Sequence, residues 1–132
     1  MANIMNKRLL IVGAGGCGKL ILDEIIRNGF HYEPIGFIDD SLNLQGKKVD
    51  NIPVLGRLSD IKKIVKEKRI DEILIAIPSL TGDPLERLIE KVKETQKIIR
   101  IVPPIFGVIQ SIERTADQSG KIVVQSGKIS VD

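Results

Sequence analysis

A cluster of glycines between an apolar run and a helical pattern constrains this chain more than any other feature. In LLIVGAGGCGKLILDEII, residues 9–26, the first four residues are all apolar, as in a parallel strand buried on both faces. After the glycines, apolar residues recur at helical spacing and predict a buried helix face of Cys17, Leu20, Ile21, Ile25 and Ile26. Gly29 stands where a left-handed residue would end that helix. The segment therefore predicts a strand, a tight turn and a helix.

Strand and helix patterns alternate after this point. Apolar runs predict buried strands in PIGFIDD (34–40), DEILIAIP (71–78) and KIIRIVP (97–103). Residues 41–56 are rich in turn formers, and Pro53 argues against a central strand there, so we expect an edge excursion.

Two further helices are indicated by their N-terminal residues. Ser59 is the expected N-cap of a helix that runs to about Lys68. Its buried face would hold Ile61, Ile64 and Val65. The second helix is expected to have Asp83 as N-cap, Pro84 in the first position and Glu86 in a capping box. Its buried stripe would be Leu85, Leu88, Ile89 and Val92.

This alternation predicts an α/β fold, a doubly wound, Rossmann-like parallel sheet with helices on both faces and the strand order 3-2-1-4-5. After Pro104 the alternation stops, and Ser119–Ile122 is nearly repeated at Ser126–Ile129. We expect a short C-terminal β arm there, which pairs with a second copy of the chain, leads into a further domain or is a flexible tail. The predicted organisation is a nucleotide-binding domain in residues 1–110 and an arm or linker in residues 111–132 toward an absent catalytic domain.

The glycines fit two phosphate-binding motifs. Gly13, Gly18 and Lys19 match most of a P-loop, but Leu20 stands where a hydroxyl would hold magnesium. Gly13, Gly15 and Gly18 match the dinucleotide fingerprint, in which they make the turn, admit the phosphate and let the helix pack on the sheet. Backbone N–H groups at the helix N-terminus would then face a pyrophosphate. The surrounding strand and helix favour this second motif over a P-loop, and the remaining alternative is a purely structural turn.

An acid follows at the distance that a dinucleotide site requires. Asp39 stands 21 residues after Gly18, at the end of the second strand, where its carboxylate can accept hydrogen bonds from ribose hydroxyls. Because a carboxylate repels a 2′-phosphate and no arginine stands beside it in the sequence, NAD is the expected cofactor rather than NADP. Asp40 either shares this role or caps the next turn. The residues leave NAD, a nucleotide-sugar and CoA open, since each offers a pyrophosphate and a ribose.

Other polar residues near these motifs have two interpretations each. Ser79 and Thr81 follow a strand at the edge where ligands bind in such sheets, and they either contact ligand or cap the next helix. Lys19 either reaches a phosphate or points to solvent. Cys17 lies near a helix N-terminus that is expected to lower its pKa, so it is either a reactive thiol or a small packing residue.

Composition argues against several classes of protein. The 20 basic residues are scattered against 17 acidic ones, with three Phe, one Tyr and no Trp, so we expect no nucleic-acid binding. A single cysteine and a single histidine argue against disulfides and metal sites. We find no apolar run of about 18 residues and no secretory signal, so we expect no membrane segment in this chain and a cytoplasmic location.

The chain also lacks an evident catalytic pair. Short-chain dehydratases and epimerases use a tyrosine followed four residues later by a lysine, but Tyr32, the only tyrosine, is followed at that spacing by Gly36. We therefore expect this chain to bind a ligand without transforming it.

The order of motifs from Arg8 to about Ile109 resembles one known family. The motifs are LLIVGAGGCGKLILDEI, PIGFIDD, GKKVDNIPVLGRLSDI, IDEILIAIPS and IIRIVPPIFGVI. They resemble the N-terminal Rossmann-like domain, often called CoA-binding-type, of CapD-type polysaccharide-biosynthesis proteins, which are nucleotide-sugar 4,6-dehydratases or epimerases. The resemblance implies a membrane-anchored parent enzyme whose catalytic domain follows this one.

The resemblance also assigns roles to residues. It implies that the glycines of the loop line the phosphates, that Asp39 and Asp40 contact the ribose, and that residues 77–79 form the opposite wall. The candidate cofactor-binding residues are Gly13, Gly15, Gly16, Cys17, Gly18, Asp39, Asp40, Ile77, Pro78 and Ser79. No catalytic or metal-ligating residue is assigned.

Two alternatives remain. The GAGGxGK loop, GFIDD and PVLG are also similar to the nucleotide-sugar-binding domains of sugar O-acyltransferases of the sialic-acid acetyltransferase type. Those proteins usually carry histidine in place of Cys17 and continue into hexapeptide repeats, which are not seen here. The other alternative is a ligand- or redox-sensing interaction module that forms a homo-oligomer through its C-terminal arm.

Overall fold

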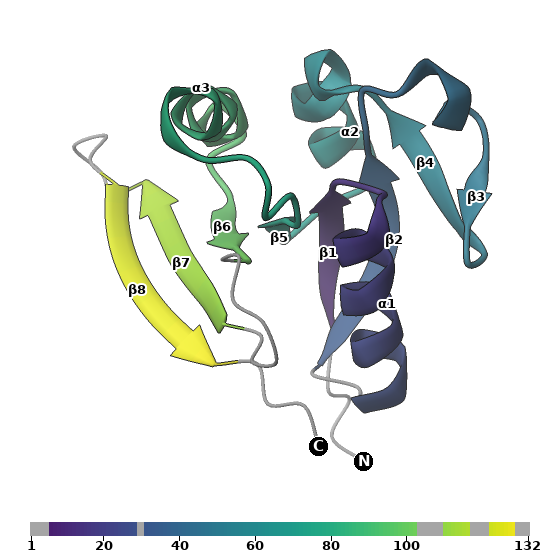
Figure 1. Cartoon of the computed structure of the whole chain (residues 1–132), viewed down its shortest axis with the longest axis horizontal. Coiled ribbons are helices and arrows are strands. Elements are labelled where there is room, and N and C mark those ends of the chain that lie inside the picture. The colour runs from purple at the N-terminus through teal and green to yellow at the C-terminus, as the bar shows by residue number, and fades with distance from the viewer. Residues whose placement is uncertain (1–5, 29–30, 103–109, 117–121, 129–132) are drawn as a thin grey trace.

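The computed structural model describes residues 6–28, 31–102, 110–116 and 122–128. In chain order the elements are β1 (Lys7–Val12), α1 (Gly16–Asn28), β2 (Tyr32–Ile38), the 3₁₀ turn η1 (Leu42–Leu44), β3 (Lys48–Val49), β4 (Ile52–Gly56), the 3₁₀ turn η2 (Leu58–Asp60), α2 (Ile61–Glu67), β5 (Glu72–Ile75), α3 (Gly82–Lys93), β6 (Ile98–Ile101), β7 (Gln110–Ala116) and β8 (Ile122–Lys128). Figure 1 shows a central sheet with helices packed on it. None of the helices in the described ranges is long and apolar enough to cross a membrane.

The sheet has the order β3-β4-β2-β1-β5-β6-β7-β8. Its five central strands, β4, β2, β1, β5 and β6, are all parallel to their neighbours. Numbered along the chain, these five strands have the order 3-2-1-4-5, which confirms the predicted α/β fold. The complete sheet differs by antiparallel strands at both edges. Pro53 lies in β4, the outermost parallel strand, and pairs with Lys48 of the two-residue β3.

The C-terminal β arm extends the sheet of its own chain. β7 pairs antiparallel with β6, and β8 pairs antiparallel with β7. Most of the SGKI near-repeat, at residues 119–122 and 126–129, lies outside the described residues, as does the helix end predicted at Gly29.

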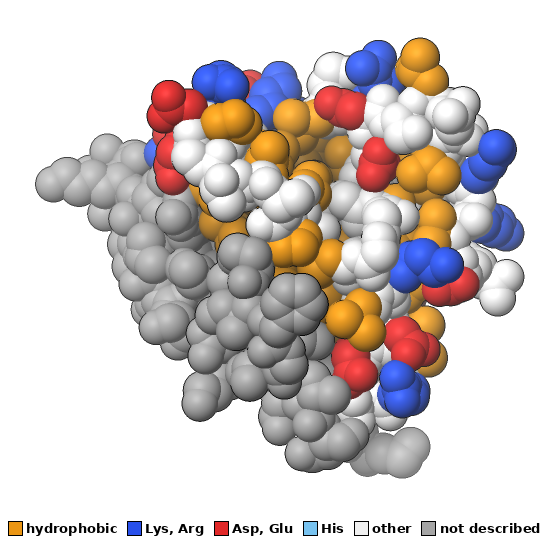
Figure 2. Space-filling view, viewed as in Figure 1, with side chains coloured by type: hydrophobic (Ala, Val, Ile, Leu, Met, Phe, Trp, Pro, Cys, Tyr) orange, Lys and Arg blue, Asp and Glu red, His pale blue; other side chains and the backbone are white. Residues whose placement is uncertain are grey.

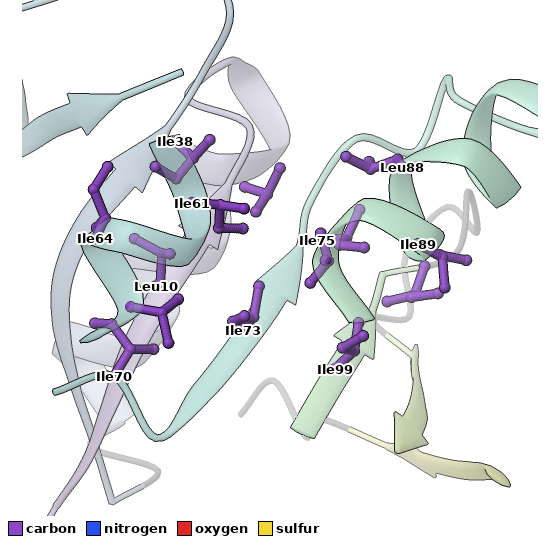
Figure 3. Close-up of a cluster of buried hydrophobic side chains, with 14 residues drawn as sticks. Leu10, Ile38, Ile61, Ile64, Ile70, Ile73, Ile75, Leu88, Ile89 and Ile99 are labelled. Carbon is purple, nitrogen blue, oxygen red and sulfur yellow. The ribbon is translucent and has the colours of Figure 1, made fainter. Parts of the chain in front are cut away.

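Helices cover the two faces of the sheet unequally. α1 packs on one face against a cluster that includes Leu9 and Ile11 of β1. α2 and α3 share the other face, where a larger cluster includes Leu10, Ile73 and Ile75 (Figure 3). Because right-handed crossovers that run in opposite directions along the sheet place their helices on opposite faces, this arrangement follows from the strand order. Successive side chains of a strand point to opposite faces, so neighbouring residues of β1 contribute to different clusters.

The buried face of α1 is rotated from its predicted position. Its buried residues are Gly18, Ile21, Leu22, Glu24 and Ile25. Leu20 and Ile26 were predicted on this face, but they are 52% and 59% exposed. The predicted stripe is wrong at these two positions because Gly18 brings the backbone of α1 against the sheet, and that contact fixes which residues face inward.

The two later helices begin at other residues than predicted. Ser59 lies inside η2, and α2 starts at Ile61 with Asp60 as its N-cap. α3 starts at Gly82 with Thr81 in an extended conformation as its N-cap, so the predicted cap at Asp83 is wrong. Pro84 is then the third helical residue, which is tolerated because N–H groups in the first turn have no acceptor within the helix. The buried stripe of each helix is otherwise as predicted, with Leu85 only partly buried.

One carboxylate is buried in the sheet near the amino ends of the strands. Glu72 is 1% exposed and accepts hydrogen bonds from Lys7 Nζ at 2.9 Å, Tyr32 Oη at 2.5 Å and Arg100 Nε at 3.0 Å. Burial raises the pKa of Glu72, but the hydrogen bonds from Arg100, Tyr32 and Lys7 outweigh it, so the net pKa lies below its usual value. Burial and the hydrogen bond to Glu72 raise the pKa of the Tyr32 phenol. The four side chains come from β1, β2, β5 and β6, and together they form what we call the Glu72 cluster.

Candidate functional site

Two glycines of the loop between β1 and α1 are required by contacts with the backbone. Gly13 has a φ of +108°, and a Cβ there would lie 2.7 Å from Ile77 Cγ1 and 2.8 Å from the Ala76 carbonyl oxygen. A Cβ on Gly18 would lie 2.0 Å from the Gly13 carbonyl oxygen. The first glycine thus makes the turn and the last allows α1 to pack closely, as the dinucleotide fingerprint demands.

The two middle glycines have open space instead. A Cβ on Gly15 or Gly16 would find no atom within 4 Å. The Gly15 carbonyl accepts the N–H of Lys19 at 3.0 Å, which makes Gly15 the residue that caps the start of α1. The N–H groups from Gly16 onward belong to the first turn of α1, where N–H groups have no acceptors inside the helix. Open space beside free N–H groups is the arrangement that admits a phosphate. Lys19 itself is exposed.

Asp39 holds the loop in place. Its Oδ2 accepts the backbone N–H of Ala14 at 2.9 Å, and its Oδ1 accepts the N–H of Ser41 at 2.8 Å. The carboxylate therefore ties the glycine loop to the end of β2. Each carboxylate oxygen has a further lone pair, so the two backbone bonds leave room for donors from a ligand.

Asp40 is bound on its outer side by residues that follow β4. Its Oδ1 accepts the N–H of Leu58 at 2.8 Å and lies 3.8 Å from Arg57 Nε. No arginine was expected beside Asp39 in the sequence, and in the structure Arg57 lies beside the neighbouring acid, Asp40. The parallel pairing of β4 with β2 brings Arg57 next to Asp40 although they are distant along the chain.

A cavity of about 370 Å³ lies at the carboxyl ends of the strands, and we call it the glycine-loop cavity. Four of the predicted residues line it: Gly13, Asp39, Asp40 and Ile77. α3 and η2 supply most of the other walls, with Leu58, Pro84, Arg87 and Leu88. In Figure 2 hydrophobic side chains lie in the hollow between α3 and the region of α2 and β4. In a parallel sheet ligands bind at this edge, where the direction of strand succession reverses.

Other predicted residues lie beside the cavity or away from it. Gly15 and Gly16 are exposed on the adjoining loop, whereas Gly18 is buried in the contact with Gly13. Pro78 and Ser79 form the turn after β5 and are not among the residues that line the cavity, which Ile77 and Leu80 reach instead. The Leu80 N–H closes this turn by donating to the Ile77 carbonyl at 3.0 Å.

Cys17 is half-buried against the core on the α1 face. Burial raises the pKa of its thiol. The pKa is therefore raised rather than lowered as expected, and the cause is the loss of solvent around the thiol. A raised pKa leaves less of the reactive thiolate at neutral pH, which favours the packing role for Cys17.

Sequence reasoning missed the contribution of α3 and η2 to the site. Leu88 was predicted only as a core residue, and Leu58, Leu80 and Arg87 were not assigned. The signal that could have found them is positional, because every loop that leaves the carboxyl end of a parallel strand meets the others at one edge.

A larger cavity of about 610 Å³ lies elsewhere, between the C-terminal ends of α2 and α3. Its lining includes Lys66, Arg69, Asp71, Gln96 and Lys97. It is at the opposite edge, where β5 begins, and no glycine turn borders it. The smaller cavity is therefore the candidate site in spite of its size.

Comparison with known proteins identifies relatives. Residues 2–103 match the family described as CoA-binding domain. The probable polysaccharide biosynthesis protein EpsC of Bacillus subtilis is 32% identical over 99 residues, which are 74% of this chain and 17% of EpsC. This chain therefore spans less than a fifth of the length of that relative. The match agrees with the resemblance to polysaccharide-biosynthesis proteins that the motifs indicate.

Solved structures share the fold. The UDP-D-quinovosamine 4-dehydrogenase structure from Vibrio fischeri superposes with a TM-score of 0.70 at 24% identity, over 96% of this chain and 95% of that one. RSP, a Rex-family repressor, in its complex with β-NADH superposes with a TM-score of 0.63 at 20% identity, over 76% of this chain and 47% of RSP. At these identities the likeness establishes a common Rossmann-like fold.

Proposed function

Because the chain belongs to the family of CoA-binding domains, we propose that it binds NAD(H) or a nucleotide-sugar within a nucleotide-sugar dehydratase or epimerase of polysaccharide biosynthesis. One observation carries this proposal. The glycines of the loop divide into two that the backbone requires, Gly13 and Gly18, and two that face open space, Gly15 and Gly16. A turn with a purely structural role needs the first pair and has no use for the second.

The electrostatics of the loop support a pyrophosphate as the bound group. The N–H groups of the first turn of α1 carry the positive end of the helix dipole, and they adjoin the open space at Gly15 and Gly16. Asp39, which bonds to the Ala14 N–H, lies next to this loop and lines the glycine-loop cavity. A nucleotide with its phosphates on the loop would bring its ribose hydroxyls toward Asp39 and Asp40.

The relatives support the biological setting. EpsC is named as a polysaccharide biosynthesis protein, and the Vibrio fischeri structure is named as a nucleotide-sugar dehydrogenase. RSP was solved with NADH. NAD(H) and a nucleotide-sugar are accordingly the two ligands that we place first, with CoA as the third.

In our proposal the described residues of this chain bind the ligand and do not catalyse its reaction. The acids of the cavity are hydrogen-bonded to backbone N–H groups, and Tyr32 donates to Glu72, a buried residue at the start of β5. Residues 1–110 would form the nucleotide-binding domain, and residues 111–132 would lead toward the catalytic part of the parent protein. The raised pKa of Cys17 argues against the redox-sensing alternative.

A thermal-shift panel tests the proposal. NAD, NADH, NADP, CoA, UDP and UDP-N-acetylglucosamine are compared on the wild type, Gly15→Leu and Gly15→Ala. A ligand at a hundred times its dissociation constant stabilises the fold by about 2.7 kcal/mol, which is a shift of several degrees for a domain of this size. We expect NAD(H) or the UDP-sugar to give that shift in the wild type.

The Gly15 variants separate binding from folding. Gly15→Leu would project a large side chain into the open space and abolish the shift. Its Cβ meets no atom within 4 Å, so we expect its own melting temperature to fall by only the few degrees that a weaker N-cap costs. Gly15→Ala is the graded control, and Lys66→Gln at the other cavity should keep the full shift. A panel without any shift, or an unchanged shift in Gly15→Leu, would contradict the proposal.

A further inference from the structure

Arg87 is an arginine without a partner among the described residues, and it lines the glycine-loop cavity. It lies on α3, across from the acids at the end of β2. The ion pairs and side-chain hydrogen bonds of the described chain involve neighbouring residues of α3, with Lys93 paired to Glu90 at 3.7 Å and Lys91 to Glu94 at 3.7 Å. Arg87 takes part in none of them.

The lack of a partner does not come from a lack of acids at the right spacing. Asp83 precedes Arg87 by four residues and Glu90 follows it by three, and both spacings bring side chains together on a helix. On α1 the same four-residue spacing gives the pair of Arg27 and Asp23 at 2.6 Å. On α3 the corresponding pair does not form, and Arg87 borders the cavity.

Neither Asp39 nor Asp40 forms an ion pair with Arg87 in the described part of the chain. Asp39 accepts backbone N–H groups on both oxygens, and Asp40 accepts the Leu58 N–H and lies beside Arg57. Each carboxylate therefore has its own donors nearby on the β2 side. Arg87 is the cation that lines the cavity from the α3 side.

We infer that Arg87 is a specificity-determining residue, and that its guanidinium binds an anionic group of the ligand other than the pyrophosphate on the glycine loop. This inference rests on the proposed function. A guanidinium offers a planar set of donors that fits a phosphate or a carboxylate. The chemical class is thus a nucleotide with a second anionic group, either a phosphate on its ribose or a carboxylate on its sugar.

Three matched pairs of ligands test this inference by isothermal titration calorimetry. CoA and dephospho-CoA differ by a ribose 3′-phosphate, and UDP-glucuronic acid and UDP-glucose differ by a carboxylate. NADP and NAD differ by the 2′-phosphate that Asp39 is expected to repel, and they form the control pair. We expect the anionic member of one pair to bind about tenfold more tightly to the wild type, as one charge-assisted contact would provide. Preference within the CoA pair would identify a phosphate, and preference within the UDP-sugar pair a carboxylate.

Variants assign the preference to Arg87. Arg87→Gln should reduce the tenfold difference to near unity by weakening only the anionic member, and Arg87→Lys should retain part of it. Lys66→Gln is the matched control, because it removes a cation that lines the other cavity and should leave the difference unchanged. Since Arg87 is exposed, its replacement leaves folding intact.

The outcomes separate this inference from the proposed function. Equal binding within every pair by the wild type, or an unchanged preference in Arg87→Gln, overturns the role of Arg87 while the nucleotide site stands. If no nucleotide binds at all, both the proposed function and this inference fail.

Discussion

The two ends of the parallel strands are built in opposite ways. At the carboxyl ends, the glycine loop leaves space open and exposes backbone N–H groups, and its one anchoring carboxylate, Asp39, bonds to backbone. At the amino ends of the same sheet, the Glu72 cluster joins four strands through side chains, and its central carboxylate is almost inaccessible to solvent.

This difference indicates that the carboxyl ends of the strands serve ligand binding and that the amino ends serve the stability of the fold. A ligand can enter where backbone groups and space are left unoccupied, and such a region contributes little to the stability of the fold. A buried carboxylate with three donors stabilises the fold through them, because removal of the carboxylate takes the shared acceptor away from two cations and a phenol. Substitutions at the two ends should therefore affect different measurements.

The largest effect is expected from Glu72→Ala. It leaves Arg100, with a side chain only 22% exposed, and the half-buried Tyr32 without their acceptor, and removing one partner of a buried ion pair costs about 3–5 kcal/mol. Urea unfolding measures the loss. The control is Glu33→Ala on β2, whose exposed pair with Arg8 at 3.7 Å should contribute less than about 1 kcal/mol. Equal losses in the two variants would remove the distinction between the ends.

Gly18→Ala tests whether every glycine of the loop has room for a side chain. A Cβ there meets the Gly13 carbonyl oxygen at 2.0 Å, so the loop or α1 must shift, and overpacking of this kind costs about 1–3 kcal/mol. Gly15→Ala, three residues earlier, meets no atom within 4 Å, so its cost should be limited to the weaker N-cap that alanine makes, which is below about 1 kcal/mol and less than the cost of Gly18→Ala. The comparison is made by denaturant unfolding of both variants. A larger loss in Gly15→Ala than in Gly18→Ala would contradict the division of the glycines.

The same contrast explains what could be predicted from the sequence. The glycine loop, the strand order and Asp39 are predictable because each depends on local pattern or fixed spacing, such as the 21 residues from Gly18 to Asp39. The Glu72 cluster is not, since its side chains stand at positions 7, 32, 72 and 100 and meet only through strand pairing. Glu72 itself lies in an apolar run, where its charge gave no sign of its partners.

The residues of the candidate site were also predictable only where they depend on local sequence. Gly13, Asp39, Asp40 and Ile77 were predicted and line the cavity, because they end strands or follow them directly. Arg87 lies six residues into α3, and its position at the cavity depends on how that helix packs on β5 and β6. Helix starts were missed for a related reason, since several polar residues near each start can serve as cap and tertiary packing chooses among them.

We expect Glu72 to contribute to the loss of unfolding free energy at acid pH. Its pKa is lowered in the folded chain, so the unfolded chain binds its proton first as pH falls, and the stability that Glu72 contributes is present at neutral pH. That contribution begins to fall near the unfolded pKa of about 4.3 and is lost as pH falls through the folded pKa. Urea unfolding between pH 7 and pH 3 should therefore show a shallower acid decline in Glu72→Gln. Parallel profiles for wild type and variant would contradict the lowered pKa.

The smallest effect is expected from Arg57→Gln, at the ligand edge. Arg57 and Asp40 resemble the pair of Arg100 and Glu72 in charge, but their side chains are 50% and 60% exposed and their closest atoms are 3.8 Å apart. Water and salt screen such a pair, so a double-mutant cycle with Asp40→Asn should give a coupling free energy below about 0.5 kcal/mol. The Leu58 N–H keeps an oxygen acceptor at position 40 in either variant, so the turn after β4 should persist. A coupling of 2 kcal/mol or more, on the order measured for desolvated charge pairs, would mean that the ligand edge is held by ion pairs as the amino end is, and the contrast between the two ends would then reduce to the glycines alone.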